Sequence, residues 1–256
     1  MTDGILVEFC GLPGAGKSTL AAGLAGALAG RGLSTRDGAA SIGPSIPSAR
    51  RVPRKLLLTA THGLANPIAS FRIGARIATA GHAGTAPGPV NLGARFVQWT
   101  VTQRLFTVAQ SSSGVHVFEE GLVQALWSIG LRGDVAPVLS ELNRRPGSWI
   151  QPDLVVVVDV PADVAADRLR RRVSRHSRIQ MRPGNEQMQE LRRGELLLEQ
   201  LVEWFLRDAA GSAGTVVRVS GENDPTGAIA LKLVIDQIVP LAARLCSPDR
   251  RRTGLA

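Results

Sequence analysis

The eight residues from Gly11 to Ser18 constrain this chain more than any other segment. They read Gly-Leu-Pro-Gly-Ala-Gly-Lys-Ser and match the pattern G-x-x-x-x-G-K-[ST]. The six residues before them, ILVEFC at positions 5–10, are typical of a short buried strand, and residues 19–29 are rich in helix formers. A strand, a glycine-rich loop and a helix in this order form the context in which the pattern holds phosphate groups.

The spacing within the loop predicts how phosphate is held. Glycines allow positive φ angles that turn backbone N–H groups inward at a helix N-terminus, where the helix dipole favours anions. Lys17 then reaches the β- and γ-phosphates, and the Ser18 hydroxyl is placed to ligate Mg²⁺. Lysine otherwise occurs only at positions 55 and 232, which argues against a chance match. We therefore predict ATP and Mg²⁺ as cofactors, with nucleotide bound by Gly11, Pro13, Gly14, Ala15, Gly16, Lys17, Ser18 and Thr19.

Length and composition favour one α/β domain over residues 1–256. The chain has 256 residues and 44% hydrophobic content, enough for a full core. Cys10 and Cys246 have neither the number nor the spacing of a disulfide framework or a metal site. No signal peptide or membrane-spanning stretch is recognisable, so a cytoplasmic location is expected. Oligomeric state is left open, a homodimer included.

Positive charge is concentrated in two tracts. The net charge is +9, yet no Asp or Glu occurs between Asp37 and Glu119, or within the arginine cluster from Arg168 to Arg182. A single arginine is usually part of a solvated helix face, but two acid-free tracts favour an anionic substrate, nucleic acid or an anionic membrane as partner. Nucleic acid is disfavoured, because aromatic content is 4% and Tyr is absent.

Alternating strand and helix patterns predict a parallel sheet with helices on both faces. Strands are expected at 4–10, 33–36, 115–118, 154–159 and 215–219. Residues 41–91 read as irregular and punctuated by Pro and Gly, with short helices at 54–64 and 67–80. Further helices are expected at 17–31, 92–110, 122–131, 134–144, 163–173, 187–209 and 226–245.

Three segments together resemble the thymidylate kinase-like branch of the P-loop nucleoside monophosphate kinases: the phosphate loop, the strand and acid at 115–120, and the Pro-Asp-Leu strand at 152–160. This resemblance implies a three-layer α/β P-loop kinase fold with a parallel sheet, helices on both faces and an arginine-rich lid at 170–186. Residues 41–95 would form an inserted basic region on the acceptor side. The family's Asp-Arg-aromatic segment is replaced here by Glu119-Glu120-Gly121, so the likeness concerns the kinase scaffold rather than thymidine recognition.

Acids at strand ends are the candidate catalytic carboxylates. Glu119, and after it Glu120, follows the strand expected beside the phosphate-loop strand, where a carboxylate can hold Mg²⁺ or act on the acceptor. Asp159 also ends an apolar strand, but Pro161 marks a helix start there and favours a capping role. Acceptor binding is predicted for Arg36, Asp37, Arg95 and Arg104.

Arginines of the expected lid address the charge on the transferred phosphoryl group. The variable loop positions are Leu12, Pro13 and Ala15, so the loop itself supplies no guanidinium. Within the family that the chain resembles, members of this type use lid arginines to stabilise the transition state. The candidates are Arg171, Arg172, Arg175 and Arg178, and spacing does not choose among them.

The sequence thus predicts an ATP-dependent phosphotransferase acting on a small anionic acceptor, such as a nucleoside monophosphate-like metabolite. One alternative is a kinase for a hydroxyl acceptor, such as a sugar, nucleoside or antibiotic, which would need Glu119, Glu120 or Asp37 as base. A third hypothesis is a regulatory ATP-binding protein or ATPase that docks on anionic membranes through residues 49–80. Its surface would comprise Arg72 and Arg76 beside Phe71, Ile73 and Ile77.

Overall fold

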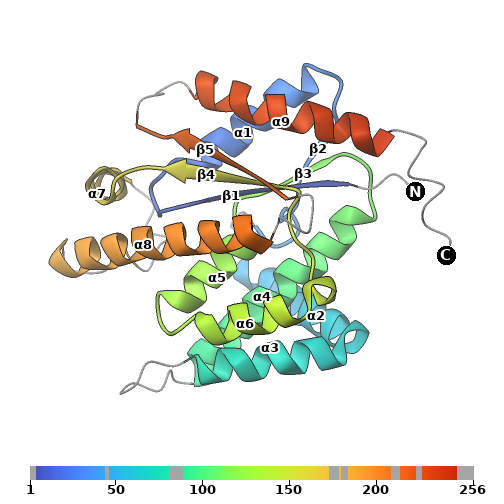
Figure 1. Ribbon diagram of the computed structural model, residues 1–256, viewed down its shortest axis with the longest axis vertical. Coiled ribbons are helices and arrows are strands. Elements are labelled where there is room, and N and C mark those ends of the chain that lie inside the picture. Colours follow the sequence, from blue (N-terminus) through green and yellow to red (C-terminus); the bar gives the residue numbers. More distant parts are fainter. Residues whose placement is uncertain are drawn as a thin grey trace.

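A five-stranded parallel sheet forms the centre of the computed structural model, which describes residues 4–43, 46–80, 89–172, 179, 184–208, 214–222 and 227–246. The strand order is β2-β3-β1-β4-β5, with parallel pairing throughout. All carboxyl ends therefore meet at one edge, toward which the arrowheads of β4 and β5 point at the left of Figure 1. The strands are β1 (Ile5–Gly11), β2 (Thr35–Asp37), β3 (Val115–Phe118), β4 (Leu154–Asp159) and β5 (Thr215–Ser220).

Helices cover both faces of this sheet. In Figure 1, α1 (Lys17–Ala29) and α9 (Ala228–Cys246) lie above it, while α8 (Gly184–Asp208), α5 (Leu122–Gly130) and α4 (Pro89–Gln110) lie below. A further group extends below these: α2 (Ser48–Ala65), α3 (Pro67–Thr79), α6 (Ala136–Arg144) and the short η1 (Pro146–Ser148). The helix α7 (Ala162–Arg171) follows β4 at the carboxyl edge. The predicted three-layer α/β arrangement is confirmed.

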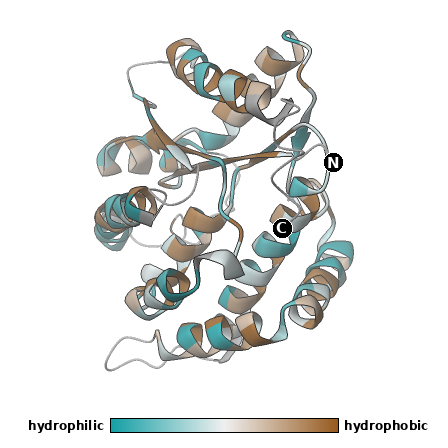
Figure 2. Ribbon diagram, turned by 45° about the vertical axis from the view of Figure 1, so that its right-hand side comes forward, coloured by the Kyte–Doolittle hydropathy of each residue, from teal (hydrophilic) through white to brown (hydrophobic). Residues whose placement is uncertain are grey.

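The core lies between the sheet and its two helical layers. Residues 154–158 of β4 and the whole of β1 are buried, as expected for parallel strands covered on both faces. Much of the sheet is correspondingly brown in Figure 2, whereas the helices carry both colours. Two ring contacts lie on the lower side of the sheet. Phe106 of α4 packs edge-on against Phe118 of β3, with ring centroids 4.7 Å apart. Trp149 stacks on Trp204 of α8, with ring centroids 5.6 Å apart.

The helix predicted at 67–80 is confirmed by α3, whereas the helix predicted at 54–64 is too short and the irregular stretch predicted before it is wrong for residues 48–53. Residues 48–65 form one helix of 18 residues, and α4 begins at Pro89 rather than Leu92. Pro67 begins α3 as predicted, and Pro47 directly precedes α2. At a helix start the absent N–H costs nothing. Pro53 lies inside α2 but on its exposed side, where water can satisfy the freed carbonyl group. Over the described ranges, none of the helices is both long and apolar enough to cross a membrane.

Candidate active site

The phosphate loop joins β1 to α1 in the conformation that its glycines permit. Gly14 and Gly16 have φ angles of +90° and +101°, in the left-handed region that side chains disfavour. A Cβ atom at Gly14 would also lie 2.7 Å from the carbonyl oxygen of Ala165 on α7. Backbone turn and close approach therefore both require glycine at position 14.

Lys17 begins α1 and folds its side chain back over the loop. Its Nζ donates hydrogen bonds to the carbonyl oxygens of Gly11 at 2.8 Å and of Leu12 at 3.1 Å. Burial lowers the pKa of Lys17, and the thiol of Cys10 and the carboxylates of Glu120 and Glu119 oppose that shift. The ammonium group is thus held inside the loop, where it can meet a phosphate.

Ser18 and Glu119 are brought into direct contact. The Ser18 hydroxyl donates a hydrogen bond to Oε2 of Glu119. This pairing follows from the topology, because β3 lies next to β1 and Glu119 comes directly after β3. A hydroxyl and a carboxylate are the oxygen ligands that Mg²⁺ accepts alongside water and phosphate. This pair is therefore the candidate Mg²⁺ site. Among the described residues, no group of three or more His, Cys, Asp or Glu could hold a metal ion.

Two further carboxylates lie at the same edge. Glu120 is exposed, and its charge acts on Lys17. Asp37 ends β2, where its Oδ1 accepts a hydrogen bond from the N–H of Ala39 at 2.9 Å. Because Asp37 is in register with Val117 of β3, it lies beside the strand that leads to Glu119. This part of the carboxyl edge is therefore acidic.

The predicted acceptor arginines do not gather at this edge. Arg36 is exposed on β2 opposite His116. Arg95 is buried, and its Nη2 donates to the carbonyl oxygen of Arg132 at 3.2 Å. Arg104 lies on α4 near His62. Burial lowers the pKa of His62, and the positive charge of Arg104 lowers it further. Among the described residues, no hydrogen bond or ion pair joins any of these arginines to the phosphate loop.

Of the four predicted lid arginines, the structure describes two. Arg171 is 80% exposed and pairs with Asp167 at 2.7 Å, one turn earlier on α7. Arg172 follows α7, and its positive charge lowers the pKa of Lys17. Arg172 is also exposed, and its charge acts at the phosphate loop through Lys17. Arg175 and Arg178 lie outside the described residues.

Arg168 is a loop contact that the sequence reasoning missed. From α7 its Nη1 donates to the carbonyl oxygen of Ala15 at 3.3 Å, and its Nη2 donates to that of Gly221 at 2.8 Å. One guanidinium thus joins the phosphate loop, α7 and the segment after β5. Within the sequence, it could not be distinguished from the neighbouring solvated arginines.

Glu8 is the second residue that was missed. It is fully buried in β1, where its carboxyl group accepts hydrogen bonds from the N–H groups of Leu122 at 2.8 Å and Gln124 at 3.0 Å. Burial raises the pKa of Glu8 from its ordinary value of 4.5 to about 7, against the lowering effect of these N–H donors. Glu8 therefore holds the N-terminus of α5 to the phosphate-loop strand.

Gly121 makes this connection sterically possible. A Cβ atom at Gly121 would lie 2.5 Å from Oε2 of Glu8. The buried carboxyl group of Glu8 thus holds the backbone directly after the turn of Glu119, Glu120 and Gly121. A lone ionisable residue in an otherwise apolar strand was the sequence signal for this role.

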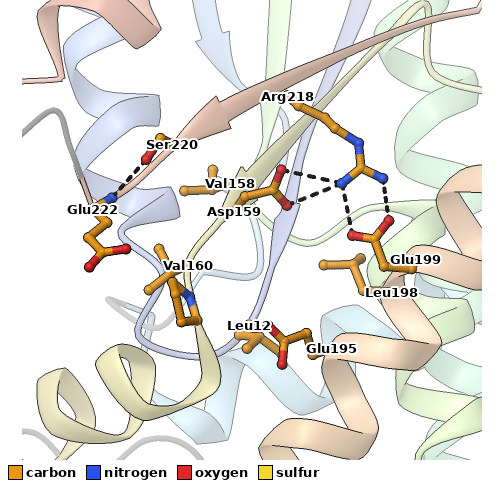
Figure 3. A pocket seen from close by; sticks show the side chains of 11 residues that line it. Leu12, Val158, Asp159, Val160, Glu195, Leu198, Glu199, Arg218, Ser220 and Glu222 are labelled. Atoms are coloured by element: carbon orange, nitrogen blue, oxygen red, sulfur yellow. Dashed lines mark hydrogen bonds and ion pairs between the residues drawn. The ribbon is translucent and has the colours of Figure 1, made fainter.

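A cavity of about 320 Å³ opens beside the loop, on the other side of β1 from Glu119. Figure 3 shows Leu12 and four carboxylates around it, those of Asp159, Glu195, Glu199 and Glu222. Arg218 also lines the cavity, but the four carboxylates leave it with a net negative charge, which disfavours phosphate.

The interpretation of Asp159 as a helix cap is wrong. The N-cap of α7 is Pro161, which has no side-chain hydrogen bond. Asp159 instead accepts from Nη1 of Arg218 at 3.3 and 3.4 Å, and Arg218 also pairs with both carboxylate oxygens of Glu199 at 2.8 and 2.5 Å (Figure 3). Burial raises the pKa of Asp159, and Arg218 opposes that shift. This ion-pair group binds α8 to the sheet.

Comparison with known proteins identifies the fold of this chain. No protein-family model matches the sequence, and no curated protein matches it. A solved deoxyadenosine kinase from M. mycoides, with the products dCMP and a flexible dCDP bound, is 14% identical with a TM-score of 0.50, over 91% of this chain and 98% of that one. The structure of that kinase with bound dATP is 14% identical with a TM-score of 0.49, over 92% and 100% of the two chains. The first likeness confirms the P-loop kinase fold.

Proposed function

We propose that this chain is an ATP-dependent phosphotransferase that phosphorylates a hydroxyl group of a small molecule such as a nucleoside or sugar. The observation that carries the proposal is the placement of two carboxylates in succession. Glu119 contacts Ser18, while Glu120 is exposed at the same edge and acts on Lys17. One carboxylate is thereby assigned to the metal, and the other is available to the acceptor.

The roles follow from these positions. The loop N–H groups and Lys17 bind the phosphates, and Ser18 and Glu119 would hold Mg²⁺, which neutralises charge on the phosphate oxygens. The acceptor oxygen attacks the γ-phosphorus, the bond to the β–γ bridging oxygen breaks, and ADP leaves. Glu120 takes the proton from the acceptor hydroxyl. Arg172 would stabilise the charge on the transferred group.

A hydroxyl acceptor fits the edge better than the anionic acceptor that the charge pattern favours. Asp37, Glu119 and Glu120 make the acceptor side acidic, and this opposes a phosphorylated substrate. Two arginines of the basic tract are engaged away from this edge, since Arg76 pairs with Glu141 at 3.5 Å and Arg95 bonds the carbonyl group of Arg132. The similar M. mycoides protein is a deoxyadenosine kinase, and a nucleoside acceptor here would be consistent with that likeness.

The acceptor is tested directly by measuring ADP production from Mg²⁺-ATP with a panel of nucleosides, sugars and nucleoside monophosphates. We expect turnover with members of the unphosphorylated set. Turnover confined to the monophosphates would overturn the proposal in favour of the anionic acceptor.

The two glutamates are separated by their response to metal. Glu120→Gln is expected to lower kcat by about a hundredfold to ten-thousandfold at every Mg²⁺ concentration, because an amide cannot take the proton. Glu119→Gln should be partly rescued by raised Mg²⁺, and Glu203→Gln, an exposed glutamate on α8, serves as control. Rescue of Glu120→Gln by Mg²⁺ would show that this residue serves the metal instead.

A further inference from the structure

The outer faces of α2 and α3 carry large apolar side chains that no described residue covers. Leu64 is 83% exposed, Phe71 76%, Ile68 66% and Leu57 63%. Leu64 and Ile68 lie on either side of Asn66, where α2 ends and α3 begins. We call the set Val52, Leu56, Leu57, Leu64, Ile68 and Phe71 the outer surface.

These residues are not the packing face of α2. That helix packs against α4 along the side that carries Thr59 and His62. Thr59 and Thr100 are hydrogen-bonded at 3.0 Å, and His62 is buried. Val52, Leu56 and Leu64 recur at four-residue or eight-residue spacing and share one side of the helix. A helix that needed only to cover α4 would carry polar residues there.

The helix α3 likewise has one buried side and one exposed apolar side. Its exposed residues differ from those of the membrane surface that the sequence predicts. Ile73 and Ile77 are buried and face the interior, so they are not part of an exposed surface. Arg76 is engaged by Glu141. Phe71 and Ile68 are the residues that project outward.

Basic side chains border the outer surface. Arg50 and Arg54 are exposed on α2, and Arg72 is half-buried on α3 next to Phe71. In the described parts of the chain, none of these three arginines forms an ion pair. No acidic residue occurs anywhere between positions 37 and 119 of the sequence. The outer surface therefore combines apolar area with uncompensated positive charge.

We propose that the outer surface binds the headgroup layer of an anionic membrane. Apolar side chains flanked by arginines match a surface with negative headgroups above an apolar interior. A second copy of the chain fits less well, because a symmetric contact would bring these positive borders against each other. The proposal does not depend on the acceptor of the enzyme.

The location of the outer surface leaves the candidate active site free. In Figure 1 the corner between α2 and α3 lies at the lower right, whereas β4 and β5 point to the left, toward the edge that carries the phosphate loop. A chain held through α2 and α3 would thus still admit nucleotide and acceptor.

Sedimentation with lipid vesicles tests this surface. The full chain is mixed with vesicles of phosphatidylcholine alone or of phosphatidylcholine with phosphatidylserine. We expect about tenfold tighter binding to the anionic vesicles, with the difference falling as salt is raised. Failure to sediment with the anionic vesicles, or equal binding to both kinds, would overturn the proposal.

Matched variants locate the binding to α2 and α3. Leu64→Ser combined with Phe71→Ser, and separately Arg50→Gln combined with Arg54→Gln, should each weaken binding by about tenfold. Leu196→Ser is the control, because Leu196 is 69% exposed on α8. An equal loss in that control would overturn the assignment.

Gel filtration of the same variants separates the membrane from a second copy. We expect the parent and the Phe71→Ser variant to elute alike, with unchanged thermal midpoints. A dimer that Phe71→Ser dissociates, together with no vesicle binding, would show that another copy of the chain covers the outer surface.

Discussion

The carboxyl edge of the sheet and the outer surface of α2 and α3 use charged residues in opposite ways. At the edge, Lys17 is tied to loop carbonyl groups, Ser18 to Glu119, and Glu8 to the N-terminus of α5. On the outer surface, Arg50 and Arg54 have no ion-pair partner among the described residues. Catalysis needs side chains that partners hold in fixed positions. Attraction to a broad charged surface needs only that enough side chains of the opposite charge lie on one face.

The largest expected effect compares two lysines, Lys17 at the carboxyl edge and Lys55 on α2. Lys17→Ala should lower phosphoryl transfer by about a thousandfold or more, because Lys17 carries the charge that meets the phosphates. Lys55→Ala on α2 should leave transfer unchanged. Transfer rates and thermal midpoints of both purified variants check this. Comparable transfer in Lys17→Ala and the parent would break the comparison.

The next effect lies within the arginines that follow one another at the end of α7. Arg172→Ala should lower kcat by about a hundredfold, because its charge reaches Lys17. Arg171→Ala should have a mild effect, since Arg171 is largely exposed and paired with Asp167. Steady-state kinetics with varied ATP measures both. Equal losses would mean that the charge of Arg172 at Lys17 does not distinguish the two arginines.

The last effect concerns stability and its dependence on pH rather than the rate. Burial raises the pKa of Glu8 from 4.5 to about 7. The protonated carboxyl group is therefore favoured in the fold, and its stabilisation is complete below pH 4.5 and lost as pH rises through about 7. Relative to Glu8→Gln, the parent should lose roughly 3 kcal/mol of unfolding free energy between about pH 4.5 and pH 8.

Urea unfolding of the parent and of Glu8→Gln over that pH range gives the difference. Glu203→Gln, at an exposed site on α8, is the control and should run parallel to the parent. Parallel curves for the parent and Glu8→Gln would show that Glu8 does not change its proton affinity on folding.

The parts of the fold and site that were predictable are those encoded over short stretches. The phosphate loop and the strands at 115–118 and 154–159 each carry their signal within a few residues. Their order then places Glu119 beside Ser18, because parallel strands bring their carboxyl ends to one edge. This much follows from periodicity and topology.

What escaped prediction depends on distant partners. The contact of Glu8 with Leu122 spans 114 positions, and no local pattern reports it. Arg95 was assigned to the acceptor on charge alone, yet it is buried in the helical layer, and burial together with the charge of Arg132 lowers its pKa. The charged residues of a sequence predict the sign of the electrostatic potential around a segment. They do not predict which side of a helix the charged side chains occupy.

The length of α2 was also missed for a physical reason. Its Pro and Gly residues were read as interruptions, although Pro47 precedes the helix and Pro53 is exposed. Helix prediction from sequence relies on a polar face opposite an apolar one. The exposed leucines of α2 place apolar residues on both faces and so weaken that signal.

The close approach of Gly121 to Glu8 restricts how this sequence can diverge. Any side chain at 121 would enter the space that the Glu8 carboxylate fills, 2.5 Å from a Cβ atom there. A replacement at 121 is therefore tolerated only after Glu8 has shortened, and the two positions should vary together among descendants of this chain. We therefore expect relatives that keep the glutamate three residues before the first loop glycine to keep the glycine three residues after the third strand as well.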